Sequence, residues 1–190
     1  MKVTCPDILG PKGRIAKRLA NYEHRPEQLA MAEAVAGAIG GGRHLVVEAG
    51  TGVGKSFAYL VPAILACAGP REEGQPRRRI VVATHTISLQ EQLLHKDIPF
   101  LTSVIPLEFT AVLVKGRGNY LSRRRLQNAL ARSASLFSRD EEFDQLSTIR
   151  DWAGRTDDGS LSDLDFRPLG PVWDVVASEH GNCLGKMCPS

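Results

Sequence analysis

A glycine-rich stretch carries the residues best suited to chemistry in this 190-residue chain. It follows residues 45–47, a short apolar run typical of a buried strand, and precedes an apolar stretch of helical character. Its candidate nucleotide-binding residues are Ala49, Gly50, Thr51, Gly52, Val53, Gly54, Lys55 and Ser56. This order is typical of a P-loop, whose backbone N–H groups surround phosphate oxygens. Lys55 can reach the β- and γ-phosphates and the Ser56 hydroxyl can bind Mg²⁺, although the strict pattern has Gly where this chain has Ala49.

Three apolar runs must position that loop. Residues 45–47, 80–84 and 111–114 predict short buried strands. Helical segments are expected at 26–39, 57–68 and 88–95, the second of them kinked or shortened by Pro62. Strands that alternate with helices make βαβ units, so the sequence predicts an α/β fold with a parallel sheet. The first twenty-odd residues, rich in Pro and Gly, are expected to form an extended lead-in outside the core.

Hydroxyl side chains follow the second predicted strand. Thr84 and Thr86 would lie at the carboxyl end of that strand, where open α/β sheets bind ligands. They could hold a nucleic-acid phosphate without reading sequence. A helix cap formed by Thr86 or Ser88 is an alternative that does not exclude this role.

A basic run follows the third predicted strand. Residues 115–125 contain five basic side chains and no acidic one, together with Tyr120. Lys115 and Arg117 would suit phosphate contacts, and Tyr120 would suit stacking on single-stranded bases. Residues 1–125 carry 18 basic and 10 acidic side chains, a net charge of +8, which also favours an anionic polymer as partner.

The last third of the chain is acidic, with 6 basic and 11 acidic side chains in residues 126–190. Asp140-Glu141 is not interpreted as a Walker B motif, because no apolar strand precedes it and Ser138 fits a capping box with Glu141. Cys183 and Cys188 resemble half of a metal or cluster site, and two incidental thiols are the alternative.

Composition sets wider limits. Apolar residues make up 43% and charged residues 24% of the chain, as in soluble globular proteins. No apolar run approaches the roughly 20 residues needed to span a bilayer, and four cysteines do not suggest a disulfide framework. We therefore expect a cytoplasmic protein with no membrane partner.

The motifs together resemble the amino-terminal part of the DinG and XPD type of superfamily 2 DNA helicases. The resemblance is carried in order by the loop at 49–56 and by residues 22–28, 84–90 and 115–120. It implies a RecA-like motor domain interrupted by an iron–sulfur domain, with ATP driving 5′→3′ movement on single-stranded DNA. By that likeness Gln28 would face adenine, and Thr84 and Thr86 the DNA backbone.

Two departures from the family pattern limit what this chain is expected to do. Ser122 stands where the family has its first cluster cysteine, so an iron–sulfur cluster is doubtful. The Asp-Glu-Ala-His box and the second motor domain are absent from the sequence, which we interpret as a truncated piece. We expect the chain alone to bind ATP without turning it over.

The sequence therefore predicts a RecA-like lobe at 1–115, incomplete, and the start of a mainly helical inserted domain at 116–190. The predicted function is the ATP- and DNA-binding part of an ATP-dependent DNA helicase. The alternatives are another P-loop ATPase, or a nucleotide- or DNA-binding module without catalysis. The oligomeric state is left open.

Overall fold

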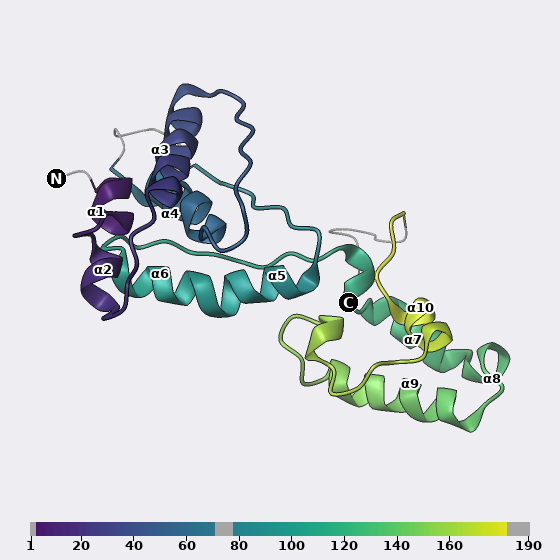
Figure 1. Cartoon of the computed structure of the whole chain (residues 1–190). Helices are drawn as coiled ribbons and strands as arrows, with labels where there is room; N and C mark the ends of the chain where they lie inside the picture. The colour runs from purple at the N-terminus through teal and green to yellow at the C-terminus, as the bar shows by residue number, and fades with distance from the viewer. Residues whose placement is uncertain (1–2, 71–77, 182–190) are drawn as a thin grey trace. The chain divides into compact units, whose positions relative to one another are not determined.

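The computed structural model describes residues 3–70 and 78–181, and the chain divides into two compact units, Met1–Leu113 (unit 1) and Val114–Ser190 (unit 2). The helices of unit 1 are α1 (Cys5–Leu9), α2 (Arg14–Arg18), α3 (Pro26–Gly41), α4 (Lys55–Ala68), α5 (Ile87–Gln92), the π-helical turn η1 (Leu93–Asp97) and α6 (Ile98–Val104) (Figure 1). Those described in unit 2 are η2 (Arg117–Asn119), α7 (Arg123–Ala131), α8 (Ser133–Leu136), α9 (Asp140–Ala153), η3 (Leu161–Asp163) and α10 (Gly170–Val176).

The core of unit 1 forms where α3 and α4 pack against each other and against α1. Helix α4 continues through Pro62 to Ala68, so the proline does not shorten it. The Phe57 ring of α4 stacks on the Phe100 ring of α6, with centroids 5.6 Å apart. Helix α4, which begins at the glycine-rich loop, is therefore held by packing along its length.

The expectation of an extended lead-in is wrong. Residues near the amino terminus form α1 and α2, and Ile8, Leu9 and Ile15 are fully buried in the core of unit 1. The turn starts at Thr4, whose backbone N–H and hydroxyl both donate to the Asp7 carboxylate at 2.8 and 2.6 Å. This local cap, followed by Pro in the first turn, allows a short helix between prolines and glycines that usually interrupt one.

The predicted parallel sheet is absent from the described residues. Residues 45–47, 80–84 and 111–114 run as extended chain, and the only β-pairs described in residues 3–70 and 78–181 are two isolated bridges in unit 2. Val46, Val81 and Val112 are 96%, 90% and 84% exposed. A buried strand needs a hydrogen-bonded neighbour and a covered face, and these apolar runs have neither here.

Unit 2 has a separate helical core. Helices α7, α9 and α10 contribute fully buried side chains such as Ile149, Val172 and Val176, with Trp152 and Trp173 also buried. Isolated bridges join Tyr120 to Ser160 and Leu121 to Ala177, and so tie the segment before α7 to the start of η3 and to the end of α10.

Helix α9 has a different cap from the predicted one. Its cap residue is Arg139, and the buried carboxylate of Glu142, rather than Glu141, accepts hydrogen bonds from the backbone N–H groups of Ser138 and Arg139 at 3.2 Å. The capping-box prediction was therefore displaced by one residue. Asp140 and Glu141 are exposed in the first turn, where acidic side chains favour a helix.

Among the residues that the structure describes, no helix is both long enough and apolar enough to cross a bilayer.

Candidate nucleotide-binding site

The glycine-rich loop leads directly into the first turn of α4. Gly54 caps this helix with φ +84°, and Gly52 has φ +86°, a left-handed region that other residues rarely adopt. An added Cβ atom at Gly50 or Gly52 would meet no atom within 4 Å, so the space beside the loop is open. The loop therefore combines glycine-dependent turns, a helix start and room for a ligand.

Lys55 spans the loop. Its ammonium donates to the backbone carbonyls of Ala49 and Gly50, both at 2.9 Å, while the side chain remains exposed. The Lys55 ammonium therefore lies against the beginning of the same loop, where it is accessible to a ligand. Ser56, the next residue, is half-buried in the first turn.

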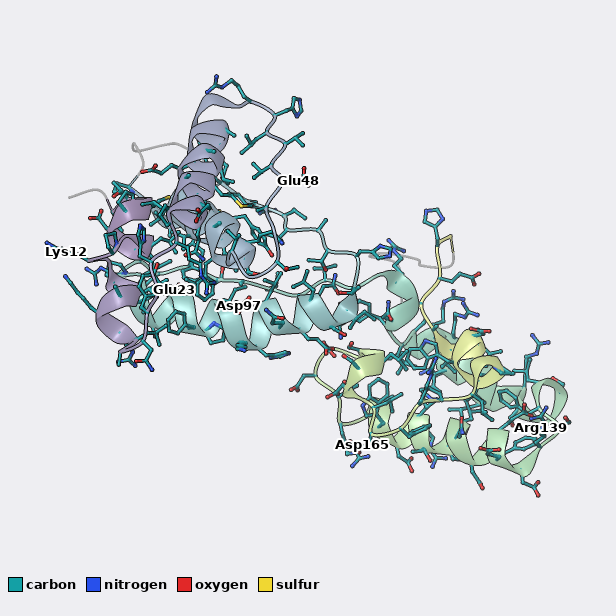
Figure 2. The ribbon with its side chains drawn as sticks, viewed as in Figure 1. Lys12, Glu23, Glu48, Asp97, Arg139 and Asp165 are labelled. Atoms are coloured by element: carbon teal, nitrogen blue, oxygen red, sulfur yellow. The ribbon has the colours of Figure 1, made fainter. Side chains whose placement is uncertain are left out.

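Arg25 and Gln28, which precede the loop in the sequence, donate hydrogen bonds to its backbone carbonyls. Gln28, in the first turn of α3, is only 6% exposed, and its amide nitrogen donates to Gly54 at 2.9 Å. The Arg25 guanidinium donates to the Gly52 carbonyl and pairs with the Glu23 carboxylate at 3.3 Å. Glu23 and Arg25 belong to the segment that enters α3, in which Figure 2 labels Glu23. The sequence analysis predicted that Gln28 faces adenine and did not predict its hydrogen bond to the loop.

The threonines after the second apolar run serve the local fold. Thr86 caps α5, since its hydroxyl accepts from the Leu89 backbone N–H at 3.3 Å, which confirms the cap alternative. The Thr84 hydroxyl donates to the Thr86 carbonyl at 3.2 Å. Thr86 is exposed and Thr84 is half-buried.

Lys115, a candidate phosphate contact, is buried in unit 2. It is only 8% exposed, and its ammonium donates to the hydroxyl groups of Ser160, at 3.3 Å, and Ser162. Its backbone N–H donates to the Tyr120 hydroxyl at 2.9 Å, which holds the half-buried Tyr120 within unit 2. Arg117 is exposed. The basic run thus contains one buried member, Lys115, whose charge is compensated by hydrogen bonds to side-chain hydroxyls.

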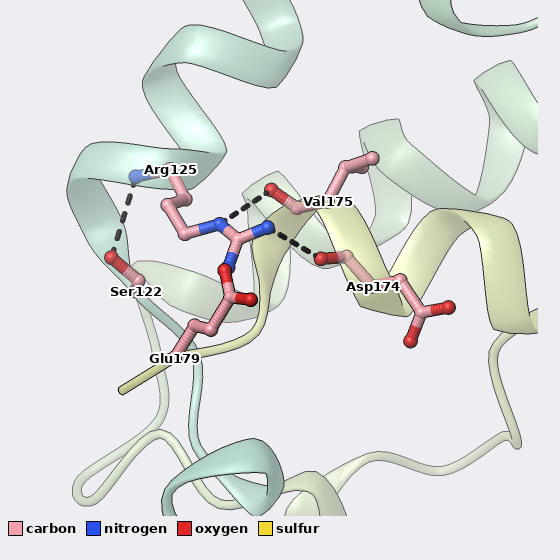
Figure 3. A network of polar contacts seen from close by, with 5 residues as sticks. All are labelled: Ser122, Arg125, Asp174, Val175 and Glu179. Atoms are coloured by element: carbon pink, nitrogen blue, oxygen red, sulfur yellow. Dashed lines mark hydrogen bonds and ion pairs between the residues drawn. The ribbon is translucent and has the colours of Figure 1, made fainter. Parts of the chain in front are cut away.

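Arg125 has a structural role that the sequence did not indicate. Its guanidinium donates to the carbonyls of Asp174 at 2.6 Å and Val175 at 3.3 Å, and pairs with Glu179 at 2.7 Å (Figure 3). The carbonyls lie at the carboxyl end of α10, where a positive charge is favourable. Arg125 therefore joins α7 to the end of α10, through partners about 50 residues away in the chain.

Ser122 caps α7. Its hydroxyl accepts from the Arg125 backbone N–H at 3.4 Å, and its own N–H donates to the Val176 carbonyl at 2.8 Å. Cys183 and Cys188 lie outside the described residues. The other two thiols are in unit 1, where burial raises the pKa of Cys5 to about 11.

The structure thus brings together one group of predicted site residues. The loop at 49–56 and Gln28 form a connected site in unit 1, to which Arg25 must be added. The signal for Arg25 was available, because it stands three residues before Gln28 and is followed by a proline that starts α3. Thr84 and Thr86 have no described contact with that loop, and the remaining candidates belong to unit 2.

Comparison with known proteins gives matches along nearly the whole chain. The family model for DEAD/DEAH box helicases matches residues 25–155. The chain is 34% identical over 184 residues to the ATP-dependent DNA helicase YoaA of Escherichia coli (strain K12), covering 96% of this chain and 27% of the relative. It is 36% identical over 205 residues to the ATP-dependent helicase DinG of Mycobacterium tuberculosis (strain ATCC 25618 / H37Rv), covering 100% of this chain and 29% of the relative.

A third relative has a different name. The 3′-5′ exonuclease DinG of Bacillus subtilis (strain 168) is 27% identical over 172 residues, which cover 88% of this chain and 17% of the relative. The chain thus spans less than a third of the length of each of these three relatives.

Proposed function

Since this chain belongs to the DEAD/DEAH box helicase family, we propose that it forms the ATP-binding part of an ATP-dependent DNA helicase that moves 5′→3′ along single-stranded DNA. The observation that carries the proposal is the loop at 49–56, in which glycine-dependent turns, the Lys55 ammonium and the start of α4 meet. These are the parts from which a phosphate cradle is built.

Nucleotide would enter on the open side of Gly50 and Gly52. Lys55 would exchange the carbonyls of Ala49 and Gly50 for phosphate oxygens, and Ser56 would hold Mg²⁺, which supplies charge neutralisation at the phosphates when bound. Gln28 is proposed to face adenine by the family likeness. Its amide nitrogen has two hydrogens, so the bond to Gly54 leaves one of them for a ligand.

The extended apolar runs support the RecA-like assignment of residues 1–115. We propose that residues 45–47, 80–84 and 111–114 become strands of a parallel sheet in the longer protein, with further strands supplied by the rest of its motor domain. Their exposed valines are the sites that such neighbours would cover. Residues 116–190 are proposed to open the inserted domain of this family.

DNA is proposed to contact the hydroxyl groups of Thr84 and Thr86 and the exposed guanidinium of Arg117. Lys115 and Tyr120 are better suited to hold this segment in place, because their polar atoms bond within unit 2. Phosphate contacts would give weak, strongly salt-dependent binding with little sequence preference.

The described residues do not fit a four-cysteine iron–sulfur cluster. Ser122 supplies a hydroxyl where a thiolate is expected, and that hydroxyl caps α7. We therefore propose that the purified chain holds no stable [4Fe–4S] cluster. Broad absorption near 400 nm with about four irons per chain after anaerobic purification would contradict this.

Nucleotide binding and turnover test the proposed function together. A fluorescent ATP analogue titrated with Mg²⁺ should bind the wild-type chain weakly, and Lys55→Ala should abolish that binding. A phosphate-release assay should show no turnover, since no Walker B acid or water-orienting residue was found in the sequence. Binding that is unchanged in Lys55→Ala would refute the P-loop, and release that depends on Lys55 would reveal an unrecognised catalytic acid.

Single-stranded oligonucleotide binding, measured by fluorescence anisotropy at several salt concentrations, tests the DNA surface. Arg117→Ala should weaken binding and lower the slope of log K against log salt by about 0.7. Arg18→Ala, at an exposed position of α2, is the charge-matched control. Equal slopes for the wild type and Arg117→Ala would exclude Arg117 as a phosphate contact.

A further inference from the structure

We propose that Arg25 and Gln28 are positioning residues that hold the phosphate loop from its outer side, and that they favour phosphate binding whatever base the nucleotide carries. The inference rests on the proposed function of the loop as a nucleotide site. It gives Arg25 a role that the sequence pattern did not assign, and gives Gln28 a second one.

The two side chains hold adjacent turns of the loop. The Arg25 guanidinium donates to the carbonyl of Gly52, and the Gln28 amide donates to the carbonyl of Gly54 at 2.9 Å. Both acceptors are the glycines whose positive φ shapes the loop, with φ +86° and +84°. Arg25 is the residue before α3 and Gln28 lies in its first turn, so the packing of α3 in the core fixes the position of both donors.

Peptide geometry links those carbonyls to the phosphate-binding groups. In a trans peptide the C=O bond and the following N–H bond point in opposite directions. A donor that fixes the Gly52 carbonyl therefore directs the Val53 N–H to the other side of the chain. In the same way, the bond to Gly54 directs the Lys55 N–H away from Gln28. A loop whose N–H groups are already oriented loses less entropy when it binds phosphate.

The fit between Gln28 and Gly54 is close enough to exclude a side chain. A Cβ atom added at Gly54 would clash with the amide nitrogen of Gln28 and lie 3.1 Å from the carbon that carries it. Gln28 is buried and therefore cannot turn aside at little cost. The amide lies against the loop backbone itself, which is the contact that a positioning role requires.

A positioning role and a base-reading role predict different losses. A residue that only recognises adenine affects ATP and leaves GTP and inorganic tripolyphosphate unchanged. A residue that orients the phosphate loop affects all three by the same factor, because only their phosphates contact that loop. Comparison of the three ligands therefore separates the two roles for Gln28, and the same comparison applies to Arg25.

The experiment measures dissociation constants of fluorescent ATP, fluorescent GTP and tripolyphosphate, the last by competition, for the whole 190-residue chain with Mg²⁺. Arg25→Ala and Gln28→Met should each bind all three about three- to tenfold more weakly, the factor expected for one lost hydrogen bond. Methionine keeps the length of Gln28 and lacks its donor. Arg25→Lys, which keeps one charged donor, should recover part of the loss.

Two controls keep the result interpretable. Glu23→Ala removes the exposed partner of Arg25 and Arg18→Ala removes an equal charge from α2, so both should bind like the wild type. The melting temperature without ligand, measured for every variant, should stay at the wild-type value for Arg25→Ala, whose side chain is 43% exposed.

Each outcome decides between the two roles. Losses confined to ATP, or affinities equal to the wild type, overturn the positioning role even when binding still depends on Lys55. Losses of similar size for all three ligands, with an unchanged melting temperature, support it. A wild-type chain that shows no Lys55-dependent binding refutes the proposed function, and the inference with it.

Discussion

Unit 1 has the larger apolar core, whereas the described polar contacts of unit 2 join residues farther apart in the sequence, up to 55 positions compared with 27 in unit 1. In unit 1, α1, α3 and α4 enclose side chains such as Ile8 and Val61, which are fully buried. In unit 2, the Arg125 guanidinium bonds the end of α10, and the Trp173 indole N–H donates to the Gly118 carbonyl at 2.7 Å.

The two units also differ in whether their extended segments are paired with other backbone. Unit 1 leaves three apolar runs uncovered, with Val46 almost wholly exposed. Unit 2 pairs its extended segments, since Leu121, Ser122 and Ser178 donate backbone N–H groups across it at 2.7–2.8 Å. The described extended segments of unit 2 therefore pair with one another, whereas the runs of unit 1 have no paired strand among the described residues.

The difference can be measured because the fluorescent residues are unevenly placed. Both tryptophans of the chain, Trp152 and Trp173, belong to the core of unit 2. Tryptophan fluorescence therefore follows the unfolding of unit 2, whereas far-ultraviolet circular dichroism follows the helices of both units.

Ile8→Ala should have the largest effect. Ile8 is fully buried, so its truncation should cost about 2–5 kcal/mol of the free energy of unfolding of unit 1. Urea unfolding followed by circular dichroism should show this loss, while the tryptophan transition keeps its midpoint. Val46→Ala, at an exposed position, should stay within about 0.5 kcal/mol of the wild type. A shift of the tryptophan transition in Ile8→Ala would show that the units unfold together.

Arg125→Ala should have an intermediate effect, in the other unit. Loss of the charged bonds to the α10 carbonyls should cost about 1.5–3 kcal/mol, seen as a lower midpoint of the tryptophan transition. Arg125→Lys should not restore the midpoint, because an ammonium cannot reproduce the fork of the guanidinium. A midpoint equal to the wild type in Arg125→Ala would show that apolar packing alone holds α10.

Ionisation of the Cys5 thiol should have the smallest effect on the free energy of unfolding, visible only at high pH. Burial raises its pKa from 9.0 to about 11, so the unfolded chain releases the thiol proton first as pH rises. The stability that the buried neutral thiol contributes is present below pH 9 and is lost between pH 9 and 11, by at most roughly 2 kcal/mol.

Cys5→Ala should flatten that decline, measured by circular dichroism during urea unfolding at pH 8, 9 and 10. Burial also raises the pKa of Tyr22, so a residual decline is expected in the variant. Equal pH profiles for the wild type and Cys5→Ala would show that the thiol is accessible in unit 1.

The sequence identified local features better than distant contacts. The glycine spacing predicted a helix start at the loop, and α4 begins at Lys55. The periodic segment at 26–39 corresponds to α3, which ends only two residues later. Both signals lie within one helical segment, where neighbours in the chain decide the structure.

The errors arose where tertiary context decides. Residues 80–84 have the composition of a strand, but a strand forms only against a partner. The sequence did not indicate that Lys115 and Arg125 bond within unit 2, because their partners lie about 45–54 residues away in the chain. The charge of a side chain was readable from the sequence, but its burial was not.

The uncovered apolar runs have a consequence for handling the protein. An extended segment that has exposed valines and no strand partner among the described residues is a template for pairing with an identical segment of another molecule. Such pairing is intermolecular, so its rate rises with concentration, and it is favoured by the low charge and strong β-propensity of residues 45–47 and 111–114. Chains held at high concentration would then be lost to cross-β aggregates while unit 2 is still folded.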